Sequence, residues 1–459
     1  LTSGKGDAST LDGGDRDGTA CIARRCRPFP DSHSPRTAAL TAQTARAPIM
    51  SERRTSLIGG CLVAIGPISM ALYTPAMPTL VAEFDTTESM IKLSLAVYFA
   101  GFALTQLVCG PMSDAFGRRV TTLGFMVLYL AGAILAMAAA NVEMLIAARI
   151  LQGVGASVGV ATARAIVRDQ FEGETSSRIM NTIGIILALG PAVSPTIGGL
   201  TLELAGWYAI FVVMMFFGLI VIGVTLGAMR ETVVPDPSRI QPKAILHSYR
   251  RLITNRHFMA TSLTVAGSVG ALYTLATVLP FVLIERAGLT PTEYGIGMLG
   301  QSGMFFSGSL AMRYLMTRTS AYRLVPVGLG FIGAGALSIT LSIAVLPVTY
   351  LSIMVPVGLY AFGIAFVMPA MTTASLAPFP HMAGAASAMM GFIQMGAGLV
   401  GGAICAAIGE PVLATQIVIP ALGVIAIGSY AVYRTRPHLA EPEPAPEVPA
   451  PELSYDGRG

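Results

Sequence analysis

Charged residues are scarce in this chain. Asp, Glu, Lys and Arg make up 12% of its 459 residues, whereas hydrophobic residues make up 53%. An ordinary soluble domain carries about 25% charged residues, so a soluble protein of this composition could not cover its surface with polar groups. The net charge of +4 comes from basic residues spread among short polar breaks. This spread excludes the concentrated basic patch of a nucleic-acid-binding protein.

Residues that would form metal, disulfide or catalytic sites are also few. The five cysteines include no CxxC pair, and three of them lie in apolar segments. The five histidines lack metal-ligand spacing, and no nucleophile–base set or phosphate-binding loop is visible. Two GxGxxG matches, at 295–300 and 328–333, lie in apolar runs without a strand–helix context, so we interpret their glycines as packing residues. The sequence therefore predicts no enzyme, no cofactor and no metal ion.

Long apolar runs dominate the rest of the chain. Crossing about 30 Å of hydrocarbon takes about 20 mostly apolar residues. Twelve such runs are present, near 57–80, 91–113, 120–140, 143–167, 179–202, 207–229, 258–284, 294–313, 324–345, 349–371, 384–408 and 412–433. They predict an all-α polytopic protein with twelve transmembrane helices in a lipid bilayer.

One long polar break, 230–257, divides these runs into two sets of six. The sets predict an N-terminal six-helix bundle over 50–229 and a C-terminal one over 258–436, a duplicated arrangement whose substrate site lies between the halves. Residues 1–49 are polar and Arg-rich, so we expect a disordered or wrongly assigned extension, with the true start at Met50. The Pro/Glu-rich tail, 437–459, is also expected to be disordered.

The distribution of basic residues predicts the orientation. With both termini in the cytoplasm, 17 Lys and Arg residues of the breaks and flanks between Arg53 and Arg436 fall on the cytoplasmic side. Only Lys92 and Arg286 fall outside. This bias follows the positive-inside rule. It makes 230–257 a cytoplasmic loop and places the single tryptophan, Trp207, at the outer interface.

The break between the second and third runs reads GPMSDAFGRR over 110–119. Gly110 can bend the end of a helix, and Gly117 permits a tight turn. Asp114 is suited to accept from the N–H groups of a neighbouring helix N-terminus, while Arg118 and Arg119 can pair with acids. We expect this cluster to latch the cytoplasmic face shut in one state and release it in another. The alternative is an ordinary turn with positive-inside charge.

This decapeptide resembles the signature loop of the major facilitator superfamily. LYTPAMPTL at 72–80 and LSLAVYFAGFALTQL at 93–107 resemble the first two spans of its drug:proton antiporters, in the bicyclomycin-resistance (Bcr/CflA) branch. RILQGVGAS at 149–157 resembles the span 4 motif, and LGPAVSPTIGG at 189–199 the antiporter motif of span 5. LPFVLIERAGLTPTEYG and AGAASAMMGFIQ resemble parts of spans 7–8 and 11. The resemblance covers about 50–436 and implies a major facilitator fold and drug:proton antiport.

The span 5 motif also has a physical interpretation. The resemblance maps Gly190, Pro191, Pro195, Gly198 and Gly199 onto that motif. Pro191 and Pro195 remove backbone donors and bend the helix, while Gly184, Gly190 and Gly198 leave a smooth surface. We expect a hinge that prevents leak during exchange, with its glycines packed against a helix of the other half. The alternative is that Gly and Pro are simply common in membrane helices.

Arg149 is the sharpest single candidate, because it lies well inside span 4. A central Arg costs about 2.5–3.5 kcal/mol even on lenient insertion scales, so it should face the bundle interior and be hydrogen-bonded. We expect a proton-relay or substrate contact, alongside Gln152. The alternative is a structural bond to carbonyls of span 1.

No Asp or Glu lies near the middle of any span. In the branch that this chain resembles, span 1 carries an acid where Ala71 stands here. Proton coupling is therefore implied by the resemblance alone. It would use Arg149 in competition with substrate, use an acid at a span end, or be absent.

Six side chains lie in spans that line the substrate cavity in the fold the resemblance implies. They are Met70, Tyr73, Tyr98, Gln106, Tyr273 and Gln394. Aromatic, Met and Gln side chains suit an amphipathic ligand; helix packing is the alternative for each.

These features together predict a multidrug efflux transporter of the bacterial inner membrane. We expect a monomer that exports small amphipathic molecules by alternating access in exchange for protons. A narrow-specificity metabolite exporter or uptake permease is the alternative within the same class. A membrane enzyme or a non-transporting receptor is the alternative from another class.

Overall fold

The computed structural model describes residues 48–171, 173–237 and 242–435. Over this part the chain is all helical, with no β-strand. Eleven of its helical segments are long and apolar enough to cross a membrane, and α12 (Pro291–Leu315), with 25 residues, supplies the twelfth. The predicted fold class is confirmed. The predicted tail, and the predicted extension up to residue 47, lie outside the described residues.

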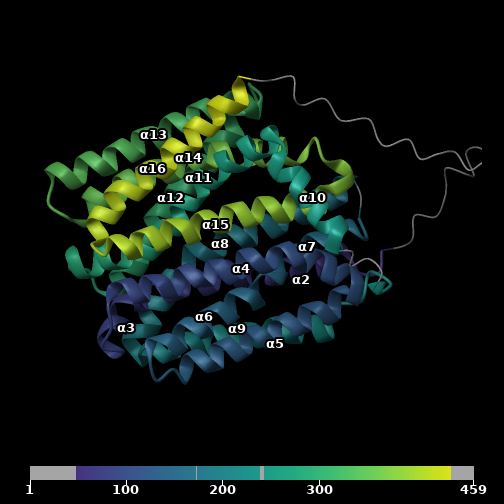
Figure 1. Ribbon diagram of the computed structural model, residues 1–459, viewed down its shortest axis with the longest axis horizontal. Helices are drawn as coiled ribbons and strands as arrows, with labels where there is room; N and C mark the ends of the chain where they lie inside the picture. Colours follow the sequence, from purple (N-terminus) through teal and green to yellow (C-terminus); the bar gives the residue numbers. More distant parts are fainter. Residues whose placement is uncertain (1–47, 172, 238–241, 436–459) are drawn as a thin grey trace, which may run out of the picture. The chain divides into compact units, whose positions relative to one another are not determined.

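The first six spans form one bundle (Figure 1). Each predicted run overlaps one of these helical spans over nearly all of its length, with ends shifted by a few residues. The spans are α2 (Glu52–Tyr73) continued by η1 (Thr74–Ala76) and α3 (Met77–Glu83), α4 (Glu88–Phe116), α5 (Arg118–Met137), α6 (Val142–Ala156) continued by α7 (Val158–Arg168), α8 (Gly173–Ala205) and α9 (Trp207–Gly227).

The last six spans form the second bundle. They are α11 (Arg256–Pro280) continued by the π-helical turn η3 (Phe281–Arg286), α12, α13 (Ala321–Val345), α14 (Tyr350–Leu376), α15 (Ala383–Ile408), which follows the short turn η4 (Pro380–Met382), and α16 (Pro411–Arg434).

Capping residues and prolines decide where these helices begin and bend. The side chains of Ser51, Thr87 and Asn141 accept hydrogen bonds from first-turn N–H groups of α2, α4 and α6. Such caps satisfy donors that would otherwise be unpaired. Pro75 has no N–H to donate, and the first span tightens into the 3-10 turn η1 at this residue.

Each half has its own apolar core, and helix pairs join the halves. One core lies mainly among α2–α9 and another among α11–α16. Across the halves, α4 packs along α15 and α8 packs along α12. Figure 1 shows α4 and α15 side by side. The site residues therefore lie inside one half or along these two pairs.

The polar break contains a helix that the sequence analysis does not predict. Helix α10 (Pro242–Thr254) is amphipathic and buries Tyr249 and Leu252 in a small core with Phe258 and Met389. The Tyr249 hydroxyl donates to the Leu107 carbonyl of α4 at 2.5 Å. Burial raises the pKa of Tyr249 to about 12, so the hydroxyl stays protonated and keeps donating. Helix α10 thereby ties α4 of the first half to the second half.

Candidate functional site

Arg149 lies fully buried inside the first half. Its guanidinium carbon is 4.4 Å from the ring centroids of both Tyr73 and Tyr98. Its Nη1 donates to Gln152 Oε1 at 2.6 Å. We call these four residues, Arg149, Gln152, Tyr73 and Tyr98, the Arg149 cage. The structure thus brings together four residues that the sequence analysis selects from three different spans.

Neutral hydrogen bonds hold the walls of the cage. The Tyr73 hydroxyl is 2.7 Å from the Ser94 hydroxyl, and the Tyr98 hydroxyl donates to the Gly66 carbonyl at 2.9 Å. Tyr129, which the sequence analysis does not select, bonds Ser69 in the same buried region at 2.5 Å. An isolated tyrosine inside an apolar span carries no sequence signal that separates this role from packing.

The guanidinium itself is only partly satisfied. Its Nε and Nη2 have no hydrogen-bond partner among the described residues. The alternative prediction, a bond from Arg149 to carbonyls of span 1, is not what the structure shows: Tyr98 takes the Gly66 carbonyl of that span, and Arg149 bonds Gln152 of its own helix. Burying charged donors without acceptors costs free energy. Nε and Nη2 are therefore free to bind an acceptor that enters the cage.

The other cavity candidates divide between the cage side and the joint between the halves. Met70 and Gln106 are buried, and the Gln106 side chain packs against Gly391 of α15. The Tyr273 ring packs against Phe99 in a tilted arrangement, with 5.5 Å between ring centres, across the halves. Gln394 is half-buried on α15. The structure therefore places Gln106 and Tyr273 in contacts between the halves.

At one end of the molecule a cluster of charges crosses between the halves. Lys92 of α4 is fully buried; its Nζ donates to Glu88 Oε2 at 2.9 Å and to the Gly409 carbonyl at 2.6 Å. Arg286 pairs with Glu88 at 3.6 Å and with Glu410 at 3.7 Å. We call Glu88, Lys92, Arg286 and Glu410 the Lys92 clasp.

The Lys92 clasp has further support from its neighbours. The Lys92 ammonium lies 4.9 Å from the centre of the Phe281 ring in η3. Nearby along the same joint, Glu203 of α8 accepts from the Thr292 N–H of α12 at 3.1 Å. The sequence analysis notes Lys92 and Arg286 only as basic residues on one side of the membrane. It does not connect them across the halves, because Gly409 lies far along the chain from Lys92 and Glu88 lies far along the chain from Arg286.

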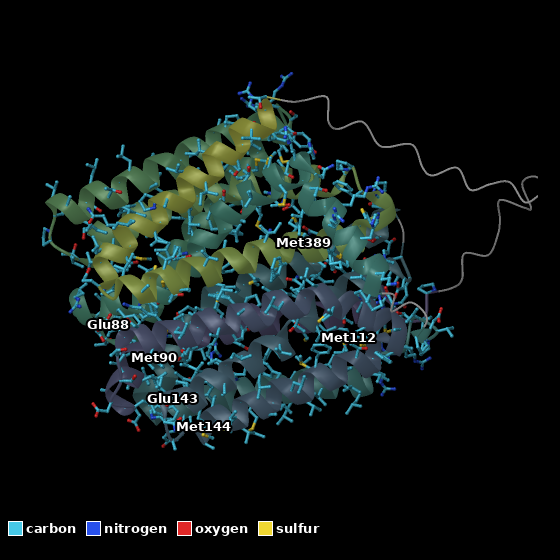
Figure 2. The ribbon with its side chains drawn as sticks, viewed as in Figure 1. Glu88, Met90, Met112, Glu143, Met144 and Met389 are labelled. Atoms are coloured by element: carbon cyan, nitrogen blue, oxygen red, sulfur yellow. The ribbon has the colours of Figure 1, made fainter. Side chains whose placement is uncertain are left out.

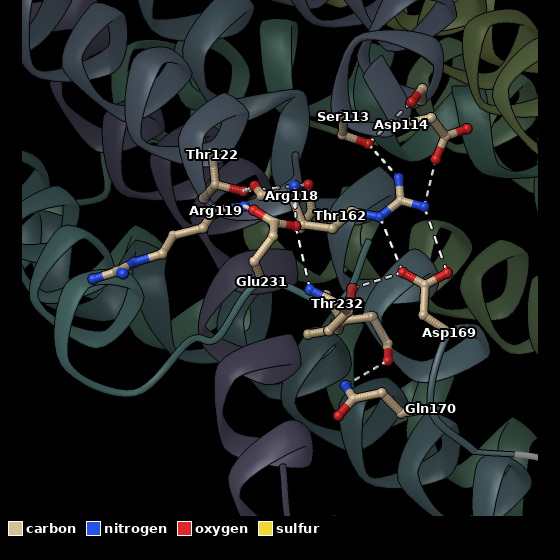
Figure 3. A network of polar contacts seen from close by, with 12 residues as sticks. Ser113, Asp114, Arg118, Arg119, Thr122, Thr162, Asp169, Gln170, Glu231 and Thr232 are labelled. Atoms are coloured by element: carbon tan, nitrogen blue, oxygen red, sulfur yellow. Dashed lines mark hydrogen bonds and ion pairs between the residues drawn. The ribbon is translucent and has the colours of Figure 1, made fainter. Parts of the chain in front are cut away.

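The GPMSDAFGRR segment makes a second polar network at the far end of α4 (Figure 3). Arg118 pairs with Asp114 and, at 3.1 Å, with Asp169. The backbone N–H groups of Arg118 and Arg119 donate to the Glu231 carboxylate at 2.7 and 3.1 Å. We call Asp114, Arg118, Asp169 and Glu231 the Arg118 network; all four belong to the first half or its trailing segment.

Gly117 makes this network possible. Its φ of 96° is a conformation that side chains rarely adopt. A Cβ there would lie 2.6 Å from Glu231 Oε2, which would push away the carboxylate that caps α5. Gly110, by contrast, has open space where a Cβ would stand, so its bending role stays a prediction.

Glu88 and Asp114 mark the separation of the two polar clusters. They lie 26 residues apart on α4, which corresponds to about 39 Å of helix. Figure 2 shows Glu88 near one end of this helix and Met112 toward the other. The Lys92 clasp and the Arg118 network therefore lie at opposite ends of the spans.

The span 5 glycines face two different helices. A Cβ on Gly198 would meet the Leu72 carbonyl at 2.4 Å, and one on Gly190 would meet Ile68, both in the first half. Gly199 instead faces α12, where a Cβ would lie 2.2 Å from the Pro291 carbonyl. The expectation that Gly184, Gly190 and Gly198 pack on the other half is therefore wrong: Gly190 and Gly198 face the first half, and a Cβ on Gly184 would meet no atom of the described residues within 4 Å. The contact of Gly199 with the other half was not predicted. A smooth glycine face indicates close packing without saying which neighbour it meets.

The prolines of this motif lie inside α8. One of them, Pro195, packs against the glycine-rich helix α12. A Cβ on Gly295 would lie 2.4 Å from the Pro195 carbonyl, and one on Gly297 would meet the Tyr350 ring at 2.6 Å. These contacts confirm the packing interpretation for Gly295 and Gly297 of the first GxGxxG match. Pro191 lies in the same helix without a contact that assigns it a role.

Ala71, which stands where the resembling branch carries an acid, is buried. Arg149 has no ion pair among the described residues. These residues also contain no cluster of three or more His, Cys, Asp or Glu side chains suited to a metal ion. The Arg149 cage thus has one positive charge and aromatic walls, with no carboxylate.

Several known transporters are similar to this chain in sequence. The chain is 31% identical over 345 residues to an uncharacterized MFS-type transporter, YdgK, of Bacillus subtilis, covering 73% of this chain and 84% of the relative. It is 27% identical over 346 residues to the multidrug transporter MdfA of Yersinia pestis (75% and 85%). It is also 27% identical over 350 residues to the multidrug resistance protein MdtL of Salmonella paratyphi A (75% and 85%).

Solved structures share the fold. A bacterial homologue of the human lysosomal transporter Spinster, in an inward-facing and unoccupied conformation, matches with a TM-score of 0.64 at 15% identity, covering 86% of this chain and 99% of that one. A D-xylose–proton symporter matches with a TM-score of 0.64 at 13% identity (83% and 97%). Residues 60–402 match the Major Facilitator Superfamily. The chain is therefore a multi-pass membrane transporter belonging to the Major Facilitator Superfamily.

Proposed function

We propose that this transporter exports small amphipathic molecules from the bacterial cytoplasm by alternating access, in exchange for protons, as a multidrug efflux protein of the Bcr/CflA branch. The observation that carries the proposal is the joint between the halves. Each half has a largely separate apolar core, and at the Glu88 end the halves are joined by ion pairs, glycine contacts and the Phe281 ring. Such a joint can open while both bundles stay intact.

The positive-inside rule supports an orientation with both termini in the cytoplasm. The Arg118 network then lies on the cytoplasmic side and the Lys92 clasp on the outer side. Lys92 and Arg286 are the exceptions to the charge bias, and both are engaged in the clasp. Their outer location is thus supported by a structural need for positive charge between Glu88 and Glu410.

In this orientation the outer end is closed. The Lys92 clasp and the Gly199 contact with α12 both join the halves there. The Arg118 network is bonded within the first half, as a released latch would be. We propose that closing the cytoplasmic face changes the partners of Asp114, whose side chain is one-third exposed.

The role of Arg149 as a proton-relay or substrate contact, with Gln152, stays a proposal of the same kind. The cage supports it through full burial and two unused donors. Proton exchange rests on the resemblance, since no carboxylate faces Arg149. The absence of an acid at Ala71 favours the second candidate function, a narrow-specificity metabolite exporter or uptake permease.

Flux through proteoliposomes with and without an imposed pH gradient tests the transport and coupling proposals together. Proton exchange predicts faster substrate movement when the gradient favours proton entry from the outer side. Resistance of expressing cells against a compound panel then separates multidrug efflux from narrow specificity. A folded protein that moves no compound of the panel would refute efflux. Equal flux with and without the gradient would refute coupling.

A further inference from the structure

The free edge of the Arg149 guanidinium is a binding element that the fold leaves unused. Nη1 is taken by Gln152, and the two orphan donors are Nε and Nη2. These two N–H groups lie on one edge of the planar guanidinium and point in parallel, which is the fork that receives both oxygens of a carboxylate. The two faces of the guanidinium plane are already covered by the rings of Tyr73 and Tyr98.

Arg149 differs in this respect from the other deeply buried cations of the described residues. Lys92 is fully buried and has both a carboxylate and a carbonyl. Arg118 is 2% exposed and has two carboxylates. Arg149 is fully buried with one amide oxygen and two aromatic faces. Stacking on rings compensates a buried charge only in part, so an acceptor for the fork is the missing partner.

A path of aromatic rings links the cage to the joint between the halves. The ring centres of Tyr98 and Phe99 are 6.1 Å apart, and Phe99 packs against the tilted ring of Tyr273 in α11 at 5.5 Å. Such rings offer an apolar surface for the body of a ligand whose charged end reaches Arg149. A carboxylate that reaches Arg149 would gain two charge-assisted hydrogen bonds from Nε and Nη2.

From this geometry we propose that the transported compounds are amphipathic carboxylates, anions with an aromatic or aliphatic body, bound through the free fork of Arg149. This inference rests on the proposed function and names its substrate class. It selects against lipophilic cations, because the cage has a positive charge and no carboxylate to receive them. Gln152 positions the guanidinium and touches no part of the ligand fork.

The test uses purified full-length protein and three probes that share one ring system: 2-naphthoate, 2-naphthamide and 2-naphthylmethylammonium. Calorimetric titration measures the affinity of each, and proteoliposome flux measures its movement. We expect binding in the order naphthoate, naphthamide, ammonium, with at least a tenfold difference between the first and last. Equal affinities, tighter binding of the ammonium, or no binding of naphthoate would overturn the proposal.

Three variants sharpen the test. Arg149→Lys keeps the charge and removes the planar fork, so naphthoate affinity should fall at least tenfold while naphthamide affinity changes less than twofold. Gln152→Glu places a carboxylate on Arg149 with almost no change of shape, so naphthoate affinity should fall and ammonium affinity should rise. Arg313→Gln removes an exposed charge on α12 as the matched control. Unchanged probe preference in Gln152→Glu, with the fold verified by thermal unfolding, refutes the assignment independently of Arg149.

The two proposals fail differently. Flux of the ammonium or the amide without preference for naphthoate would leave the exporter intact and remove the anion assignment. Tight, Arg149-dependent naphthoate binding without flux of any probe would keep the binding site and remove the efflux proposal.

Discussion

Replacing Lys92 by Met should weaken closure of the outer end more than it weakens either bundle. Lys92 is fully buried and donates to Glu88 at 2.9 Å and to the Gly409 carbonyl at 2.6 Å. Methionine fills a similar volume without the charge. Glu88 and the carbonyl then lose their nearest donor in the closed state only, because water solvates both groups once the end opens.

The magnitude follows from how much of the clasp remains. Breaking a buried ion pair by removing one partner costs about 3–5 kcal/mol. Glu88 keeps Arg286 at 3.6 Å, and its side chain is 23% exposed, so we expect a smaller loss of about 2 kcal/mol for the closed state. Each 1.4 kcal/mol is a factor of ten, so this loss shifts the closed-to-open ratio about 30-fold.

Distances between spin labels on the two halves measure that ratio. Cysteines introduced at Glu83 and Leu346 are exposed and lie at the clasp end of the first and second halves, in a background without the native cysteines. Lys92→Met should move population from a short to a long distance. Lys243→Met, an exposed lysine of α10, is the matched control and should leave the distribution as it was.

Two results would refute this reasoning. An unchanged distance distribution in Lys92→Met would mean that the clasp does not hold the outer end closed. A fall in the thermal unfolding temperature as large as that of a core substitution, without a distance change, would make Lys92 a structural residue of its own half.

Further predictions concern the other contacts described above. Arg149→Gln should abolish transport while leaving detergent-solubilised protein folded by size-exclusion chromatography; a fully active variant contradicts a transport role. Gly199→Ala should separate α8 from α12 and destabilise the protein by about 1–3 kcal/mol, because its Cβ would lie 2.2 Å from a backbone carbonyl; Gly184→Ala, with no atom within 4 Å, is the control, and equal unfolding temperatures would contradict the contact. Gly117→Ala should lower transport and stability together, since it combines an unfavourable φ of 96° with displacement of Glu231; a wild-type melting curve would show that the network tolerates the change.

Much of the fold was predictable because a bilayer restricts the chain so strongly. Backbone groups in hydrocarbon must bond within their own helix, so an apolar run of sufficient length indicates a helix almost irrespective of detail. Each of the twelve predicted runs overlaps one observed helical span over nearly all of its length. The burial of Arg149 was predictable for the same reason, because a charge in mid-span has to face the interior. Helix α10 was missed because its amphipathic pattern is short and lies in a polar break.

The partners of these residues were not predictable from sequence. Lys92 donates to a carbonyl 317 positions away in the sequence. The turn at Gly117 is shaped by Glu231, which lies 113 positions from Arg118 and whose carboxylate accepts a hydrogen bond from the Arg118 N–H. A glycine face likewise indicates that some backbone comes close, without deciding between α2 for Gly198 and α12 for Gly199.

The sequence by itself determined the number of spans, the division into two halves and the burial of Arg149. These properties depend on local hydrophobicity, chain length and the price of charge in hydrocarbon. Only the tertiary structure decided that Arg149 lacks a carboxylate and keeps its fork free, and that Lys92 and Arg286 join the halves. Those outcomes depend on which helix faces meet, and packing selects them from many arrangements that satisfy the same hydrophobic pattern.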